Sequence, residues 1–345
     1  MDLFNFSNIC YEYFEIDEIF PWDNDPEMLK FIDDLMLPFA ENVLEDMQFF
    51  SDVSKKAINT FQSLKYPFYK NYRSSVNRLT EKEEDEIIFG FLNSYDPKLL
   101  DLYKKKINDL EIFCASIGHG YAGLTYPFES LNKTVILLNG DIPYIGNAAI
   151  LMHEFGHSYE YDIMYRCGVE NYGSSIDVLP YTEVSSMFFQ YAFYKYLKEN
   201  KIYSDDTDTL LHRYYKLMFD HIYSMNIICN MDFVNINSYG YVPIENENLA
   251  KYANWIKEKL NYYDIPSNVG EEFNFKDSFI YGLGGIFSIY LYDNYKDDPN
   301  NFRKEFRNAL INYQYNGIDA FKNVGVTPDV LLKGDTLKRV LKDSR

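Results

Sequence analysis

Basic side chains are scarce in this 345-residue sequence. Lys and Arg together number 33 against 52 Asp and Glu, which gives a formal net charge of −19, and no block of Lys and Arg occurs. Proteins that bind nucleic acid or an anionic membrane surface need a concentrated basic patch to contact the phosphate groups. We therefore expect neither a nucleic-acid partner nor a membrane partner.

Long apolar runs and paired cysteines are missing as well. The longest apolar segments, such as GGIFSIYLY, are shorter than the roughly 20 residues that a membrane-spanning helix needs. The first residues lack the basic region of a secretory signal, and acidic residues follow at once. The four cysteines form no CxxC pair, so we interpret them as buried thiols in a reducing compartment. The expected location is the cytoplasm.

The apolar pattern predicts a mostly α-helical protein with one small β-sheet. Apolar residues recur at spacings of three and four from Pro26 to about Lys106, where Thr80 and Glu83 have the spacing of a capping box. From Ile112 the chain becomes rich in Gly, aromatic and β-branched residues, which favours a β-hairpin with its second strand at Thr134–Leu138. Helical spacing resumes near Asn147 and continues to the C-terminus, with turns expected near Gly173, Gly240 and Pro266.

The sequence HEFGH at 153–157 is the motif that carries chemistry. On a helix, His153 and His157 lie one turn apart on the same face, so both imidazoles can reach one Zn²⁺. Glu154 is rotated by roughly 100° and can accept a proton from a water that the metal activates. The alternative is an ordinary helix whose two histidines pack or face solvent.

A catalytic zinc needs a third protein ligand, and three acidic residues follow the motif. Glu160 lies on the same helix face, but as a ligand it would compete with the open coordination position, so we interpret it as a solvated helix residue. Asp177 lies in a turn-rich segment and suits a supporting position or a helix cap. Glu183 opens the next helical pattern, after enough chain to bring a second helix beside the first. We favour Glu183.

At this point the sequence resembles the thimet-oligopeptidase and oligoendopeptidase F family of zinc metallopeptidases. The resemblance runs from about Gly118 to the C-terminus and is carried by ILLNGD, HEFGH and EVSSMFF, in that order. It implies Glu183 as the third zinc ligand. The segment DSFIYGLGGIFSIYLYDNY resembles the family's aromatic helix start, which implies that Tyr281 hydrogen-bonds the oxyanion of the tetrahedral intermediate.

Two departures from the family support a second hypothesis. Family members place a His shortly before this Tyr, whereas GEEFNFKDSF has none, and full-length members are much longer at the N-terminus. The alternative function is therefore a catalytically weak or inactive peptide-binding protein on the same scaffold.

Together these observations predict a mostly α, multi-helix zinc-peptidase domain with a small β-sheet next to the active-site cleft. We expect a helical region at 1–110 that forms a wall of the cleft and a catalytic region at 111–345, or one continuous domain. The expected cofactor is one Zn²⁺ per chain and the expected partner is a peptide substrate. The predicted ligands are His153, His157 and Glu183, and the predicted catalytic residues are Glu154 and Tyr281.

Three further histidines and one strand need an interpretation. His119, between two glycines, suits either a substrate contact or a loop residue held by the backbone, and we interpret His212 and His221 as structural. The strand at Val135–Asn139 is expected to border the zinc helix. Its backbone groups are candidates for pairing with an extended peptide. The other interpretation, an ordinary strand of a small sheet, is compatible with that role.

Overall fold

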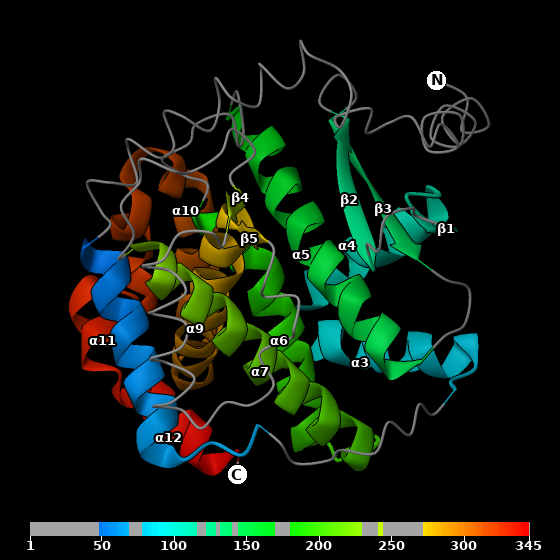
Figure 1. The fold of residues 1–345 in the computed structure, drawn as a ribbon. Coiled ribbons are helices and arrows are strands. Elements are labelled where there is room, and N and C mark those ends of the chain that lie inside the picture. Colours follow the sequence, from blue (N-terminus) through cyan, green and yellow to red (C-terminus); the bar gives the residue numbers. More distant parts are fainter. Residues whose placement is uncertain are drawn as a thin grey trace. The chain divides into compact units, whose positions relative to one another are not determined.

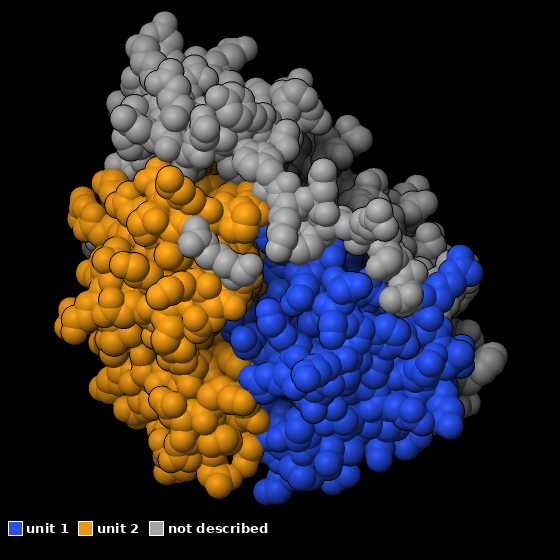
Figure 2. Space-filling model, turned by 90° about the horizontal axis from the view of Figure 1, so that it is seen from below, with its two compact units in different colours: residues 1–23, 71–170, 185–213 blue, residues 24–70, 171–184, 214–345 orange. Residues whose placement is uncertain are grey.

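The computed structural model describes residues 48–68, 78–115, 122–128, 132–139, 144–169, 180–229, 241–243 and 272–344. The chain divides into two compact units, each built from several segments, which Figure 2 colours separately. Unit 1 consists of Met1–Asp23, Asn71–Glu170 and Ser185–Arg213. Unit 2 consists of Asn24–Lys70, Asn171–Val184 and Tyr214–Arg345.

The described residues of unit 1 form several helices and a three-stranded sheet. Strand β3 is central: β1 pairs with it in parallel and β2 pairs with it antiparallel, so the order is β1-β3-β2. The long helix α5 packs against β3 and β2 (Figure 1). The elements are α3 (Glu81–Tyr95), α4 (Pro97–Asn108), β1 (Ile112–Ala115), β2 (Gly123–Phe128), β3 (Lys133–Asn139), α5 (Ile145–Cys167) and α6 (Val184–Glu199).

A buried lysine ties α4 to the sheet and to α5. The Lys106 side chain is 3% exposed, and its Nζ donates to Thr134 Oγ1 at 2.9 Å, to Glu111 Oε2 at 3.2 Å and to Asp162 Oδ1 at 3.5 Å. Burying a charge is costly unless charged and hydrogen-bonding partners surround it, as they do here. This network therefore fixes the far end of α5 against the sheet.

The described residues of unit 2 form helices and a two-stranded ladder. Gly285 allows α9 to approach α7 closely, because a Cβ at this position would lie 2.6 Å from Met218 Cγ. The elements are helical residues 48–64, α7 (Ser204–Cys229, which begins in unit 1), β4 (Tyr241–Pro243), β5 (Glu272–Asn274), α9 (Phe275–Asp297), α10 (Pro299–Asn316), a 3₁₀ segment (Gly317–Val324), α11 (Pro328–Lys333) and α12 (Asp335–Asp343).

The structure confirms the predicted fold class of a mostly α protein with a small sheet. Thr80 and Glu83 form the expected capping box at the start of α3, and the predicted hairpin is β2 with β3. The parallel strand β1 was not predicted as a partner of that hairpin. The turns expected near Gly173, Gly240 and Pro266 lie outside the described residues, and the division at residue 110 stays a prediction. Among the helices described here, none is long and apolar enough to cross a membrane.

Candidate metal centre and active site

The HEFGH motif lies within the long helix α5. The helix ends at Gly168, whose φ of 65° is left-handed and therefore suits glycine. Met152 and Phe155 are fully buried, whereas His153 and His157 are only partly buried. The helix thus turns its apolar side chains into unit 1 and leaves the two imidazoles accessible.

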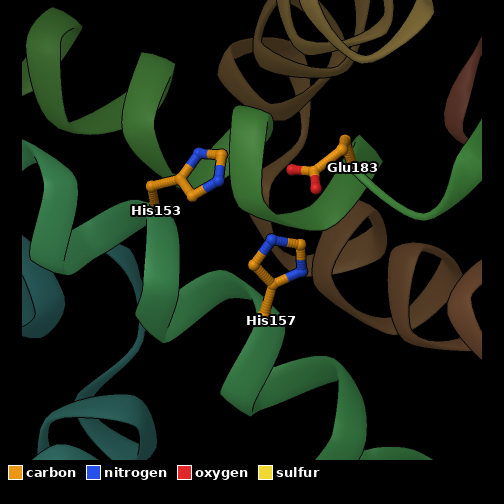
Figure 3. A group of neighbouring side chains, drawn as sticks. All are labelled: His153, His157 and Glu183. Atoms are coloured by element: carbon orange, nitrogen blue, oxygen red, sulfur yellow. The ribbon is translucent and has the colours of Figure 1, made fainter. Parts of the chain in front are cut away.

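The structure brings together the three predicted zinc ligands. One nitrogen from each of His153 and His157 and one carboxylate oxygen of Glu183 all lie within 4.8 Å of one another. Figure 3 shows both rings projecting from successive turns of α5, with the Glu183 carboxylate turned towards them. Glu183, which is 8% exposed, directly precedes α6.

This donor set fits a divalent metal ion. Ligands of a tetrahedral zinc at 2.0–2.1 Å lie about 3.3 Å from one another, so small side-chain rotations bring these three atoms to that spacing. Two imidazoles and one carboxylate are a donor set that catalytic zinc uses, and it leaves the fourth position open. No thiolate belongs to the group, which distinguishes it from a typical structural zinc site.

Gly156 sets the distance between α5 and the start of α6. A Cβ at this position would lie 2.6 Å from Ser186 Cα and 2.9 Å from the Ser185 carbonyl oxygen, so any side chain would collide with backbone. The Ser185 hydroxyl donates to the Gly156 carbonyl oxygen at 2.9 Å. The glycine of the motif therefore lets the backbone that carries Glu183 approach the helix that carries the two histidines.

Glu154, the predicted general base, is 6% exposed. Thr125 on β2 contacts it twice: the threonine Oγ1 lies 2.8 Å from Glu154 Oε2 and 2.9 Å from the Glu154 carbonyl oxygen. Gly123, two residues earlier on the same face of β2, lies so close that a Cβ there would be 2.8 Å from Glu154 Oε1. Sequence reasoning missed Gly123 and Thr125, because only the packing of β2 against α5 brings them next to Glu154.

Tyr281, the predicted oxyanion donor, lies on α9 of unit 2. Its ring centroid is 5.2 Å from that of His221 on α7, with the two planes tilted by 38°. Burial lowers the pKa of His221 to about 4, although the negative charges of Asp220 and Glu183 act in the opposite direction. The imidazole is therefore neutral near pH 7. From the sequence we interpret His221 as structural, and no sequence pattern connects it with Tyr281.

Several other expectations need correction. Glu160 is completely buried rather than solvated. The strand at Val135–Asn139 is the centre of its sheet, with both backbone edges paired, so the peptide-docking option is wrong for this strand. Cys167 is exposed, at the end of α5, and not the buried thiol that we expected. His119 and Asp177 lie outside the described residues.

Comparison with known proteins identifies the fold. No protein-family model and no curated protein matches this sequence. Among solved structures, a protein described as a peptidase from Chlamydophila abortus aligns with a TM-score of 0.57 and 13% identity over 86% of this chain. PZ peptidase A with an inhibitor aligns with a TM-score of 0.55 and 12% identity over 86% of this chain. A protein described as an oligoendopeptidase F from Bacillus anthracis str. Ames aligns with a TM-score of 0.54 and 11% identity over 93%.

These similarities confirm, at the level of the fold, the resemblance that the sequence motifs indicate. The chain shares the architecture of oligoendopeptidase-type structures, at a sequence identity too low to carry activity across. It spans only 54%, 58% and 57% of the length of the three proteins named above.

Proposed function

We propose that this chain is a zinc-dependent metallopeptidase that hydrolyses peptide bonds in oligopeptides. The observation that carries the proposal is the grouping of His153, His157 and Glu183 within ligand distance of one another, with Glu154 as the next residue on the same helix. The shared fold with oligoendopeptidase-type structures supports the substrate class.

The three ligands would hold one Zn²⁺, which when bound supplies a Lewis acid that polarises the peptide carbonyl and acidifies a water. Glu154 accepts a proton from the attacking water while the oxygen of that water bonds to the carbonyl carbon of the peptide. The same carboxyl group then gives that proton to the leaving amine, so the residue ends the cycle ionised as it began. Its burial beside β2 restricts the orientations of the carboxylate.

Tyr281 is proposed to donate its phenolic hydrogen to the developing oxyanion. His221 supports this assignment, because its ring contacts the Tyr281 ring and its pKa responds to the charge of Glu183. A neutral imidazole can itself donate one hydrogen bond. His221 is therefore the described residue best suited to assist Tyr281, in a chain whose segment before Tyr281 contains no His.

An extended peptide substrate suits the outer edge of β2. In the described sheet β2 is an edge strand, because the order is β1-β3-β2. The same strand carries Thr125, which contacts Glu154. Backbone pairing to such an edge gives affinity that does not depend on the peptide sequence. This assignment moves the predicted peptide-docking strand from Val135–Asn139 to Gly123–Phe128.

The proposal is tested by comparing wild type with Glu154→Gln in zinc binding and in cleavage of a mixture of short peptides. Wild type is expected to bind one zinc per chain and cut peptides. Glu154→Gln should lose at least about 10²-fold in kcat, because the general base is removed. It should still bind the metal, because the three proposed ligands are unchanged. Glu86→Gln, on the exposed face of α3, serves as the control and should behave as wild type.

Three outcomes are informative. Loss of cleavage with zinc retained supports the peptidase. Zinc binding with peptide binding but no cleavage in wild type favours the alternative, a peptide-binding protein on the same scaffold. A wild-type protein that binds no zinc contradicts the proposal.

A further inference from the structure

Strand β2 lies close against the carboxylate of Glu154. Thr125 Oγ1 lies 2.8 Å from Oε2, and the position of a Cβ on Gly123 would lie 2.8 Å from Oε1 and from Cγ. Residues 123 and 125 project from the same face of the strand because side chains alternate along it. The Thr125 hydroxyl therefore contacts one oxygen of the carboxylate, and the lack of a side chain on Gly123 leaves space for the other oxygen.

The Thr125 hydroxyl has two acceptors and only one hydrogen. Its Oγ1 lies 2.8 Å from Glu154 Oε2 and 2.9 Å from the Glu154 backbone carbonyl oxygen. A hydroxyl supplies one donor and two acceptor lone pairs. When Glu154 is ionised, the hydroxyl hydrogen is available to Oε2, and this charge-assisted bond is the stronger of the two.

Gly123 gives the carboxylate the room to stay there. A Cβ at position 123 would also lie 2.9 Å from Ile150 Cγ2 on α5, so the new carbon would be trapped between the helix and the Glu154 side chain. Of these two neighbours of the added carbon, the Glu154 carboxylate can move more easily than the helix, because the glutamate side chain can rotate. An alanine would therefore displace Oε1, which is the oxygen turned away from Thr125.

We propose that Thr125 is a positioning residue for the general base, holding the Glu154 carboxyl group in one orientation through its hydroxyl, and that Gly123 is required for that placement. The inference rests on the proposed function of Glu154 and adds to it the residue that orients the base. No metal ligand is involved, so metal binding and base positioning are separable.

The test compares the 345-residue chain, loaded with zinc, as wild type, Thr125→Val, Thr125→Ser and Gly123→Ala. Valine keeps the shape of threonine and removes the hydroxyl, whereas serine keeps the hydroxyl. We expect Thr125→Val to lower kcat by about 10- to 100-fold, the range seen for partners that orient active-site groups, with KM within about threefold. Thr125→Ser should keep kcat within about threefold, and Gly123→Ala should lose as much as the valine variant. Zinc content should be equal in all four proteins.

A valine variant with wild-type kcat overturns the inference, and so does a serine variant that fails as badly as valine. If zinc-loaded wild type cuts no peptide, the proposed function is wrong. Crystal structures of wild type, Thr125→Val and Thr125→Ser then test the positioning of Glu154 separately. A Glu154 carboxylate that keeps its place without the hydroxyl overturns the inference. A carboxylate that rotates away from β2 in the valine variant, and not in the serine variant, supports it.

Discussion

Replacing Gly156 by alanine tests how the candidate metal centre is assembled. The added Cβ would lie 2.6 Å from Ser186 Cα and 2.9 Å from the Ser185 carbonyl oxygen, both of them backbone atoms that cannot rotate away. Ordinary carbon–carbon contact needs about 3.5 Å, so α5 and the start of α6 must separate by about 1 Å. Glu183, directly before α6, would move with that backbone.

Two effects on stability oppose each other in this variant. Overpacking costs about 1–3 kcal/mol, whereas alanine in a helix gains up to about 1 kcal/mol over glycine. We expect a net loss of about 1 kcal/mol, which lowers Tm by about 1–2 °C in a chain of this size. Metal ligands tolerate only about 0.2 Å of misplacement, so zinc affinity should fall by at least about tenfold.

The assay is competition for zinc with a chromophoric chelator, beside thermal unfolding of the same samples. Gly282→Ala is the matched control, because its Cβ would lie 3.5 Å from the nearest atoms of His221, an ordinary contact. It should bind zinc as tightly as wild type and be no less stable. A Gly156→Ala protein with wild-type zinc affinity and unchanged Tm would refute the account of how α6 is placed.

Three further predictions concern stability and catalysis. Lys106→Ala should cost about 3–5 kcal/mol in urea unfolding, because it removes the buried cation that Glu111 and Asp162 share. Lys82→Ala, whose side chain is 85% exposed, should change stability by less than about 0.5 kcal/mol. Equal costs for the two variants would contradict the buried network. Burial, with the charges of neighbouring acids, raises the pKa of Glu84 to about 7, so the folded state favours the protonated form and its contribution to stability is lost as pH rises from about 4.5 through 7. Glu84→Gln should therefore raise Tm at pH 8 and change it little at pH 4.5; a gain that is the same at both pH values would be inconsistent with this shift. Tyr281→Phe should retain zinc and lower kcat by about 10²- to 10³-fold, as loss of one oxyanion donor does in other hydrolases, and a variant with wild-type kcat would remove Tyr281 from the proposed mechanism.

The features that sequence reasoning predicted are those set by local chemistry. The spacing of His153 and His157 fixes their shared helix face wherever α5 lies, and Thr80 and Glu83 form their capping box within a single turn. Glu183 was favoured from chain length and from the family resemblance, and the structure brings it to the histidines. Its role as a ligand stays a prediction, as do the catalytic roles of Glu154 and Tyr281.

The features that it missed depend on contacts between segments distant in sequence. Thr125 precedes Glu154 by 29 residues, and only the antiparallel register of β2 with β3 turns its hydroxyl towards α5. His221 meets Tyr281 because α7 and α9 pack closely, with Gly282 lying against the backbone of α7. Glu160 was assigned to solvent because, as a ligand, it would compete with the open coordination position, whereas the structure buries it completely.

The central claim is that His153, His157 and Glu183 bind one zinc ion. Crystals of the 345-residue chain incubated with zinc, measured on both sides of the zinc absorption edge, test it most directly. The account predicts a single strong anomalous peak about 2 Å from one nitrogen of each histidine and from the Glu183 carboxylate. The absence of a peak there, or a main peak bound by other side chains, would contradict it.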